Sequence, residues 1–167
     1  MEKTLKVLNE LEKRGLIDRY AIGGGVAALF YTEPILTYDL DVFVFLPASD
    51  NPLLTLSPLY DYLRSRGYRE HKEHVLVEGI PVQFIPAYNP LIEEAVKEAK
   101  EVKYKQVKTK VLRAEHLLAI MLQTGRPKDK ARMASFLEEA KMNQKELTQI
   151  VKRHGLSVKW SRFKKQL

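Results

Sequence analysis

The sequence predicts an α+β fold, with a mixed sheet flanked by helices and followed by a small C-terminal helical bundle. Up to residue 112, apolar residues at helical spacing alternate with short runs of β-branched and aromatic residues. From residue 114 to residue 165 the pattern is helical, with breaks at 125–127, 143 and 155. A length of 167 residues and a hydrophobic content of 45% suffice for a packed core. We therefore divide the chain into an α/β domain, residues 1–112, and a helical subdomain, residues 113–167.

The first elements are a helix, a strand and a glycine-rich turn. Leucines at helical spacing predict an amphipathic helix over 3–14, which Gly15 ends. Residues 19–23 predict a short strand that runs into three glycines, and a helix over 26–31 follows them. The stretch 39–46 is rich in β-branched and aromatic residues and ends at a proline, which is typical of a buried strand.

The remaining elements lead from the sheet into the helical part. Ser57 and Pro58 are suited to the N-cap and first turn of a helix over 59–66, which stops at Gly67. Strands over 74–78 and 82–87 are joined by a turn that contains Gly79, which predicts a hairpin. Residues 91–101 then predict a helix, residues 103–112 an extended segment, and 114–165 the helical bundle.

The basic charge is concentrated in the second half of the chain. The net charge of +7 divides into −3 for residues 1–92 and +10 for residues 93–167. Clustered Lys and Arg attract anions, so this asymmetry fits a polyanionic partner, either a triphosphate or an RNA. A solvated, lysine-rich helical surface explains it equally well.

Composition also excludes several classes of site. The chain has no cysteine, which excludes disulfides, thiolate nucleophiles and Cys-based metal sites. Its four histidines are scattered and do not suggest a zinc site, and we expect His71 and His74 to be exposed strand or turn residues. No apolar run is long enough to cross a membrane and no signal peptide is evident, so we expect a cytoplasmic protein without a membrane partner.

The segment that indicates chemistry is Gly23-Gly24-Gly25, followed after thirteen residues by Asp39-Leu40-Asp41 at the start of a strand. Aspartates separated by one residue in a strand project from the same face, so they can share a cation. Two neighbouring carboxylates favour a hard divalent ion such as Mg²⁺, which also binds substrate phosphates. A glycine turn at the start of a helix offers backbone N–H groups to a phosphate. The sequence thus predicts a site where phosphate and metal meet.

This segment resembles the nucleotidyltransferase superfamily, whose members carry Gly-Gly or Gly-Ser on a turn followed by Asp-x-Asp on a neighbouring strand. The stretch 115–120, with 126–129 after it, is similar to a Leu-Leu-Ala and Arg-x-Lys-Asp pattern of small AbiEii-like nucleotidyltransferases. The resemblance implies a nucleotidyltransferase-like mixed sheet and transfer of a nucleoside monophosphate from an NTP to an acceptor hydroxyl on RNA, protein or a small molecule.

The resemblance also implies roles for individual residues. Asp39 and Asp41 would be the catalytic residues that bind Mg²⁺ or Mn²⁺. The remaining positions would contact the nucleotide, with the glycines on its phosphates; they are Gly24, Gly25, Thr37, Gln83, Arg126 and Lys128. Lys128 has an equal alternative as an exposed first-turn lysine, and we expect Asp129 to be a first-turn or ion-pair residue rather than a ligand.

The chain departs from the family pattern at its third carboxylate. The matching strand carries Gln83, which can ligate a metal through its carbonyl oxygen but cannot act as a base at neutral pH. Either Glu78 or a group of the substrate replaces this base, or the protein has kept nucleotide binding and lost turnover.

A nucleic-acid-binding module is the alternative from another class. Basic residues alternate with aromatic ones in two segments of the second half, as RNA-binding surfaces often do. They are Lys103, Tyr104, Lys105, Lys108 and Lys110, and then Lys152, Arg153, Lys159, Trp160, Arg162, Lys164 and Lys165. For Trp160 and Phe163, packing of the last helix is favoured over base stacking.

Overall fold

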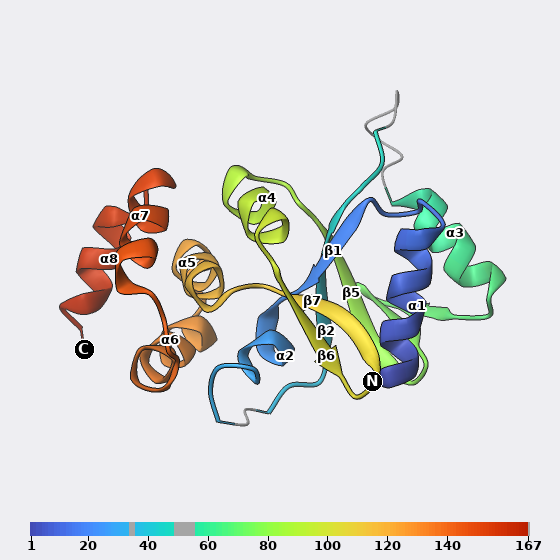
Figure 1. Cartoon of the computed structure of the whole chain (residues 1–167), viewed down its shortest axis with the longest axis horizontal. Coiled ribbons are helices and arrows are strands. Elements are labelled where there is room, and N and C mark those ends of the chain that lie inside the picture. The colour runs from blue at the N-terminus through green and yellow to red at the C-terminus, as the bar shows by residue number, and fades with distance from the viewer. Residues whose placement is uncertain (34–35, 49–55, 167) are drawn as a thin grey trace.

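A seven-stranded mixed sheet is the centre of the computed structural model, which describes residues 1–33, 36–48 and 56–166 (Figure 1). The strand order is β3-β4-β5-β2-β1-β7-β6. The pairs β2–β5 and β1–β7 are parallel, and the other neighbouring pairs are antiparallel. The strands are β1 (Arg19–Ile22), β2 (Leu40–Phe45), β3 (Arg69–His71), β4 (His74–Val77), β5 (Ile80–Pro86), β6 (Lys100–Tyr104) and β7 (Val107–Val111).

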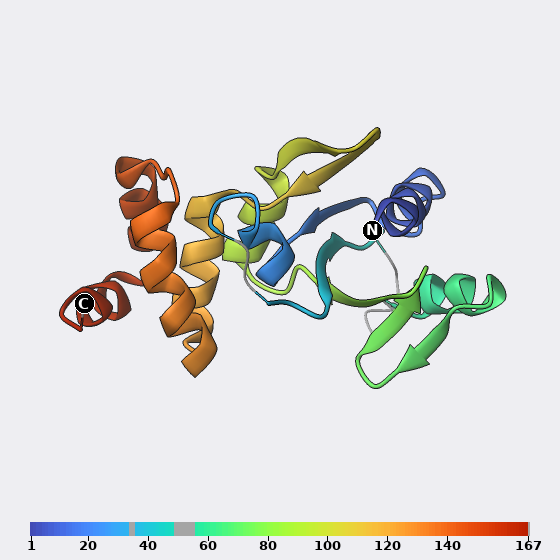
Figure 2. The same ribbon diagram turned by 90° about the horizontal axis from the view of Figure 1, so that it is seen from below.

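Among the described residues, six of the eight helices are grouped at the two ends of this sheet, and α2 and α4 pack against its central strands. Figures 1 and 2 agree that α5–α8 lie together at one end of the molecule, while α1 and α3 lie at the other. Helix α5 is the centre of the C-terminal group, since it packs against α6, α7 and α8 and also against α2 and α4. The helices are α1 (Glu2–Lys13), α2 (Gly24–Ala28), α3 (Ser57–Ser65), α4 (Pro90–Lys97), α5 (Ala114–Thr124), α6 (Pro127–Glu139), α7 (Gln144–Arg153) and α8 (Ser157–Lys164).

The core follows the predicted periodicities. The apolar face of α1 is buried against the sheet, and β2 buries the three alternate residues Leu40, Val42 and Val44 completely. Tyr20 is fully buried in this core, and its hydroxyl reaches Asn9 Oδ1 at 2.7 Å and Thr109 Oγ1 at 2.9 Å. Burial raises the pKa of Tyr20 to about 12, so the phenol stays neutral within this network.

The order of elements agrees with the α+β fold expected from the sequence, but four boundaries differ. The helix predicted over 26–31 is the five-residue α2, which begins at Gly24. A helix was predicted over 91–101 and one extended stretch over 103–112. The structure has the shorter α4 followed by a β6–β7 hairpin, because the chain turns at Lys105, whose φ is +53°. Strand β3 was not predicted, because all three of its residues are polar and exposed.

The fourth difference concerns helix starts. Helix α3 begins at Ser57 itself, so Ser57 is a helical residue and makes no side-chain cap. Helix α4 has the side-chain cap, since Asn89 Oδ1 accepts a hydrogen bond from the Ile92 N–H at 2.9 Å. The division into domains at residue 112 stays a prediction.

Candidate functional site

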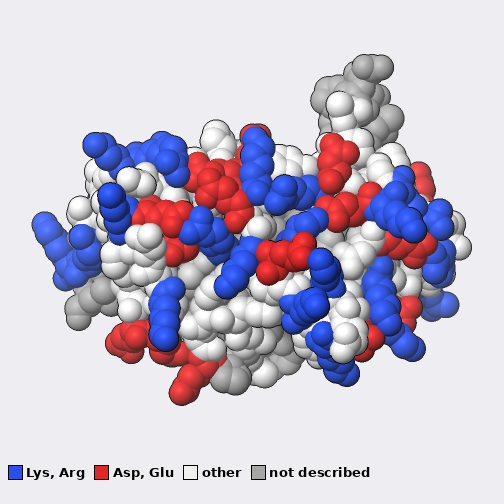
Figure 3. All heavy atoms as spheres, in the orientation of Figure 1, with Lys and Arg blue, Asp and Glu red and all other residues white. Residues whose placement is uncertain are grey.

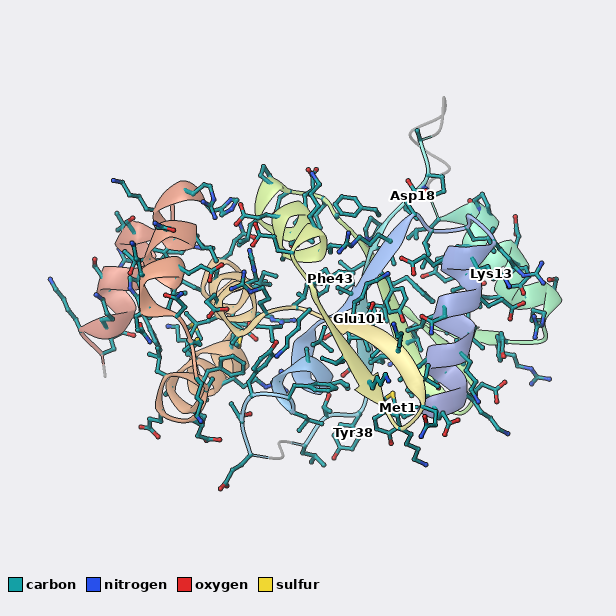
Figure 4. All side chains as sticks on the ribbon, viewed as in Figure 1. Met1, Lys13, Asp18, Tyr38, Phe43 and Glu101 are labelled. Carbon is teal, nitrogen blue, oxygen red and sulfur yellow. The ribbon has the colours of Figure 1, made fainter. Side chains whose placement is uncertain are left out.

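The two aspartates lie where strand β2 begins. Asp39 immediately precedes the strand and Asp41 is its second residue. Both are half-buried, whereas Leu40 between them is fully buried, so the aspartates face away from the core that Leu40 enters. Figure 4 labels the residues that flank this segment, Tyr38 near the edge of the molecule and Phe43 towards its middle. Asp41 lines a pocket of about 230 Å³, and Asp39 lines a neighbouring pocket of about 630 Å³.

The glycine turn lies directly against these aspartates. Gly24 has φ +56°, and a Cβ atom at this position would lie 1.8 Å from Asp41 Oδ2. A Cβ atom at Gly25 would lie 2.6 Å from Thr37 Oγ1, and that hydroxyl is 3.4 Å from Asp39 Oδ1. Any side chain at Gly24 or Gly25 would therefore push this segment away, so glycine is required for the close approach.

Gln83 lies beside Asp41 on the neighbouring strand. The parallel ladder between β2 and β5 pairs Asp41 with Gln83, and both residues line the smaller pocket. Glu78, considered as a replacement for the missing base, is elsewhere. It is exposed in the β4–β5 turn and accepts a hydrogen bond from the Tyr68 hydroxyl at 2.8 Å. Since β5 begins three residues before Gln83, Glu78 is more than about 10 Å away along the strand.

Helix α6 supplies the opposite wall of the smaller pocket. Arg126, at the N-cap of α6, lines the pocket with Asp129 and Arg132. Asp129 is completely buried and accepts two hydrogen bonds from Arg126, at 2.8 and 3.2 Å, which confirms the expectation of an ion-pair residue. The bond to Asp129 raises the pKa of Arg126 although desolvation opposes it, and the charges of Asp129, Asp41 and Asp39 add to the increase. Both predicted metal ligands, Asp39 and Asp41, therefore interact electrostatically with this guanidinium.

The smaller pocket has a polar and an apolar side. Its polar groups are those of Gly24, Asp41, Gln83 and the α6 residues, and α5 contributes the apolar side with Leu117, Ile120 and Met121. Lys128 lies in the first turn of α6, but its side chain is outside the described part of the structure. Of the residues predicted for one site, Gly24, Asp41, Gln83 and Arg126 line this pocket at the junction of the sheet with the C-terminal helices, and Thr37 and Asp39 line its neighbour.

Two residues of the larger pocket were not predicted as site residues. His74 is half-buried, and its Nε2 atom lies 3.5 Å from Asp39 Oδ2, so only His71 matches the expectation of full exposure. Arg132 lines both pockets. Its position three residues after Asp129 on α6 was the available signal, because residues three and four apart share a helix face.

A second group of ligand-type side chains lies away from the aspartates. Glu94, Glu98 and His116 lie close enough to share a metal ion. Both Glu94 oxygens, however, accept hydrogen bonds from Arg153, and Glu98 accepts one from Arg113 at 3.3 Å. The arginines already neutralise the carboxylates, so this group fits an ion-pair network between α4, α5 and α7 better than a metal site.

Glu94 is the centre of that network. His154 Nε2 lies 2.9 Å from Glu94 Oε2, and His116 Nε2 lies 3.1 Å from Glu94 Oε1. Burial of Glu94 raises its pKa, but the hydrogen bonds from Arg153, His154 and His116 outweigh this effect and lower the pKa to about 2.

The basic residues of the second half do not form one continuous patch on the face seen in Figure 3, where Lys and Arg alternate with Asp and Glu. Lys110 bonds Glu12 at 2.6 Å, and Lys108 lies 3.0 Å from Glu101. Phe163 is buried in the core and Trp160 packs against it with ring centroids 6.0 Å apart, which agrees with packing of the last helix. In the described part of the chain, no helix is both long and apolar enough to span a membrane.

Several solved structures share the fold over nearly the whole chain. A nucleotidyltransferase-like antigenic protein from Paracoccidioides brasiliensis aligns over 95% of this chain and 92% of its own, with a TM-score of 0.58 and 17% identity. The antibiotic-resistance factor ANT(2'')-Ia, in a solution structure, aligns over 99% and 96%, with a TM-score of 0.53 and 14% identity. In complex with adenylyl-2''-tobramycin, ANT(2'')-Ia aligns over 96% and 94%, with a TM-score of 0.49 and 14% identity.

No protein-family model and no curated protein sequence matches the chain. At these identities the structural likeness establishes the fold alone, and it confirms the nucleotidyltransferase-like fold that the glycine and aspartate pattern suggested.

Proposed function

We propose that this protein is a nucleotidyltransferase that binds an NTP with Mg²⁺ or Mn²⁺ between Asp41 and Arg126 and transfers the nucleoside monophosphate to an acceptor hydroxyl. The observation that carries the proposal is the position of Asp41. Its carboxylate lies against Gly24, has Gln83 beside it in the ladder, and acts on the guanidinium of Arg126 across the pocket. Carboxylate, close backbone and cation around one cavity are the groups that a metal–triphosphate requires.

The donor set fits a hard divalent cation. Asp39 and Asp41 would supply carboxylate oxygens and Gln83 an amide oxygen, and Mg²⁺ and Mn²⁺ prefer oxygen ligands. Asp41 is half-buried, and its carboxylate lies against the backbone of Gly24. When bound, the ion would neutralise phosphate charge and orient the triphosphate.

The other residues of the site would act on the nucleotide by position and charge. Arg126, fixed by its two bonds to Asp129, would balance the triphosphate charge from the helical side, with Lys128 as a second cation. The backbone at Gly24 and Gly25 would allow the phosphates to approach closely. In the transfer, the acceptor oxygen bonds to the α-phosphorus, the bond to the pyrophosphate oxygen breaks, and the hydroxyl proton is released.

Gln83 favours a second candidate on the same fold, a protein that binds the metal–nucleotide without turnover. An amide cannot take the proton of the attacking hydroxyl, and Asp129 is committed to Arg126. A transferase of this sequence would depend on the substrate or solvent for that proton.

Calorimetric titration of the four NTPs with Mg²⁺ or Mn²⁺ tests the proposal. We expect metal-dependent binding that is lost in the Asp39→Asn/Asp41→Asn double variant and kept in Asp61→Asn, a control at an exposed aspartate on α3. Pyrophosphate release with RNA, protein and small-molecule fractions offered as acceptors then separates the two candidates. Binding without release in any fraction indicates the inactive protein. No NTP binding contradicts both candidates, and salt-sensitive RNA binding would then support the nucleic-acid module.

A further inference from the structure

The larger pocket, beside Asp39, has a different chemistry from the nucleotide pocket. Its wall includes exposed apolar and aromatic groups, with Tyr38 77% and Leu76 48% exposed, and the ring of His71 lies with them. Asp39 is its single carboxylate and Arg132 its single arginine among the described lining residues. Because Asp39 is a proposed metal ligand, the charge that this pocket presents to a further ligand is positive.

Arg132 is the residue that defines this charge. It is half-buried on α6 and, among residues 1–33, 36–48 and 56–166, no hydrogen bond or ion pair satisfies its guanidinium. Arg126, six residues earlier on the same wall, has Asp129 as its partner. The five N–H donors of the Arg132 guanidinium are therefore available to a ligand. An anionic ligand would satisfy them.

The position of Arg132 indicates which ligand that is. It is a lining residue common to both pockets, so it lies where the nucleotide site meets its neighbour. In the smaller pocket, Arg126 would already balance the charge of the triphosphate. A molecule in the larger pocket would lie on the Asp39 side of the nucleotide, next to the proposed metal ion.

We infer that the larger pocket is the acceptor site and that it takes a hydroxyl compound carrying a phosphate group, with Arg132 as the counterion of that phosphate. This inference rests on the proposed function. The planar guanidinium binds phosphate through two parallel hydrogen bonds, and the exposed ring of Tyr38 and the side chain of Leu76 offer an apolar surface to the rest of the molecule. The same surface excludes a polycationic acceptor, because the pocket has no second carboxylate among its described lining residues.

Paired titrations test the acceptor site. Ribose 5-phosphate is compared with ribose, and AMP with adenosine, on the protein saturated with Mg²⁺ and a non-hydrolysable ATP analogue, which keeps AMP out of the nucleotide pocket. We expect each phosphorylated compound to bind at least about tenfold more tightly than its partner, because a charge-assisted bond to phosphate is lost in the partner. The preference should disappear in Arg132→Ala and in Arg132→Gln, which keeps more of the side-chain volume, and persist in Arg162→Ala, an exposed arginine on α8 outside both pockets.

The outcomes separate this inference from the proposed function. Equal binding of the two members of each pair, or an unchanged preference in both Arg132 variants, overturns the acceptor site even when NTP binding is intact. If no NTP binds, the proposed function fails, and the same titrations on the protein alone still show whether Arg132 selects phosphate. If ribose 5-phosphate and AMP each bind more tightly than ribose and adenosine, the pocket recognises the phosphate group itself. If only AMP binds more tightly than its partner, the acceptor is a nucleotide.

Discussion

Replacing Gly24 with alanine tests the contact on which the proposed site depends. Gly24 has φ +56°, and its new Cβ atom would lie 1.8 Å from Asp41 Oδ2 and 2.7 Å from Asp41 Cγ. Separations below 3.0 Å are essentially never found for a Cβ atom, so the Asp41 carboxylate must move by at least about 1.2 Å. A left-handed conformation costs an alanine about 1–2 kcal/mol, and this part of the effect is independent of Asp41.

Gly15 provides the matched control for that strain. Its φ is +70°, and a Cβ atom there meets nothing within 4 Å. We expect Gly15→Ala to lower the free energy of unfolding by about 1–2 kcal/mol, roughly 2–8 °C in Tm for a chain of this size, and to leave Mg-NTP affinity unchanged. Gly24→Ala should lose more stability and also weaken Mg-NTP binding by about 10- to 100-fold, because one metal ligand is displaced by about 1 Å.

A double-mutant cycle with Asp41→Ala identifies the source of the extra loss. Removing the carboxylate removes both contacts below 3.0 Å and leaves Asp41 Cβ at 3.1 Å, so Gly24→Ala in that background should cost clearly less than it does in the wild type. Urea unfolding and calorimetric titration of Mg-ATP measure the two effects. The reasoning is refuted if Gly24→Ala binds Mg-ATP as the wild type does, or if its stability cost is the same with and without Asp41.

Three further changes follow from the same structure. Gln83→Asp should tighten Mn²⁺ binding, measured by calorimetry, since it adds a carboxylate beside Asp41 in the ladder; an unchanged affinity would show that the two positions do not share a cation. Glu94 has its folded-state pKa lowered to about 2, so its contribution to stability is present above its ordinary pKa of 4.5 and is lost as the pH falls from 4.5 towards 2. Glu94→Gln should therefore flatten the pH dependence of Tm in this window, and an identical acid profile would count against the network. Phe136→Ala removes a side chain that is 1% exposed and packs edge-to-face on Tyr31, and should cost about 3–5 kcal/mol in urea unfolding; a loss below 1 kcal/mol would mean that α6 is loosely packed.

The sequence predicted those parts of the fold that depend on local pattern. The burial of β2 followed from its β-branched and aromatic run, and the hairpin at Gly79 from its turn residue. The polar strand β3 has no such pattern, since it is held by pairing with β4 rather than by burial of its side chains. The order of strands in the sheet also depends on contacts distant in sequence, which periodicity does not encode.

The candidate site also contains residues that the sequence pattern indicated and residues that it did not. The spacing of the glycines and aspartates, and the match of Gln83 to the third position, agree with the contact of Gly24 with Asp41 and with the β2–β5 register. The roles of these residues stay predictions. His74 and Arg132 escaped notice because each joins the site through tertiary packing, from β4 and from the second turn of α6, with no motif around it.

The two outermost strands have a consequence for how the protein behaves at high concentration. An open strand with free N–H and C=O groups is a template on which other chains can add and begin a fibril. Strand β3 is only three residues long and entirely exposed, and β6 at the far edge carries Lys100, Glu101 and Lys103 along five residues. Short edges rich in charge repel an incoming strand and leave it little length to pair with. The sheet can therefore keep both edges open to solvent and still resist aggregation.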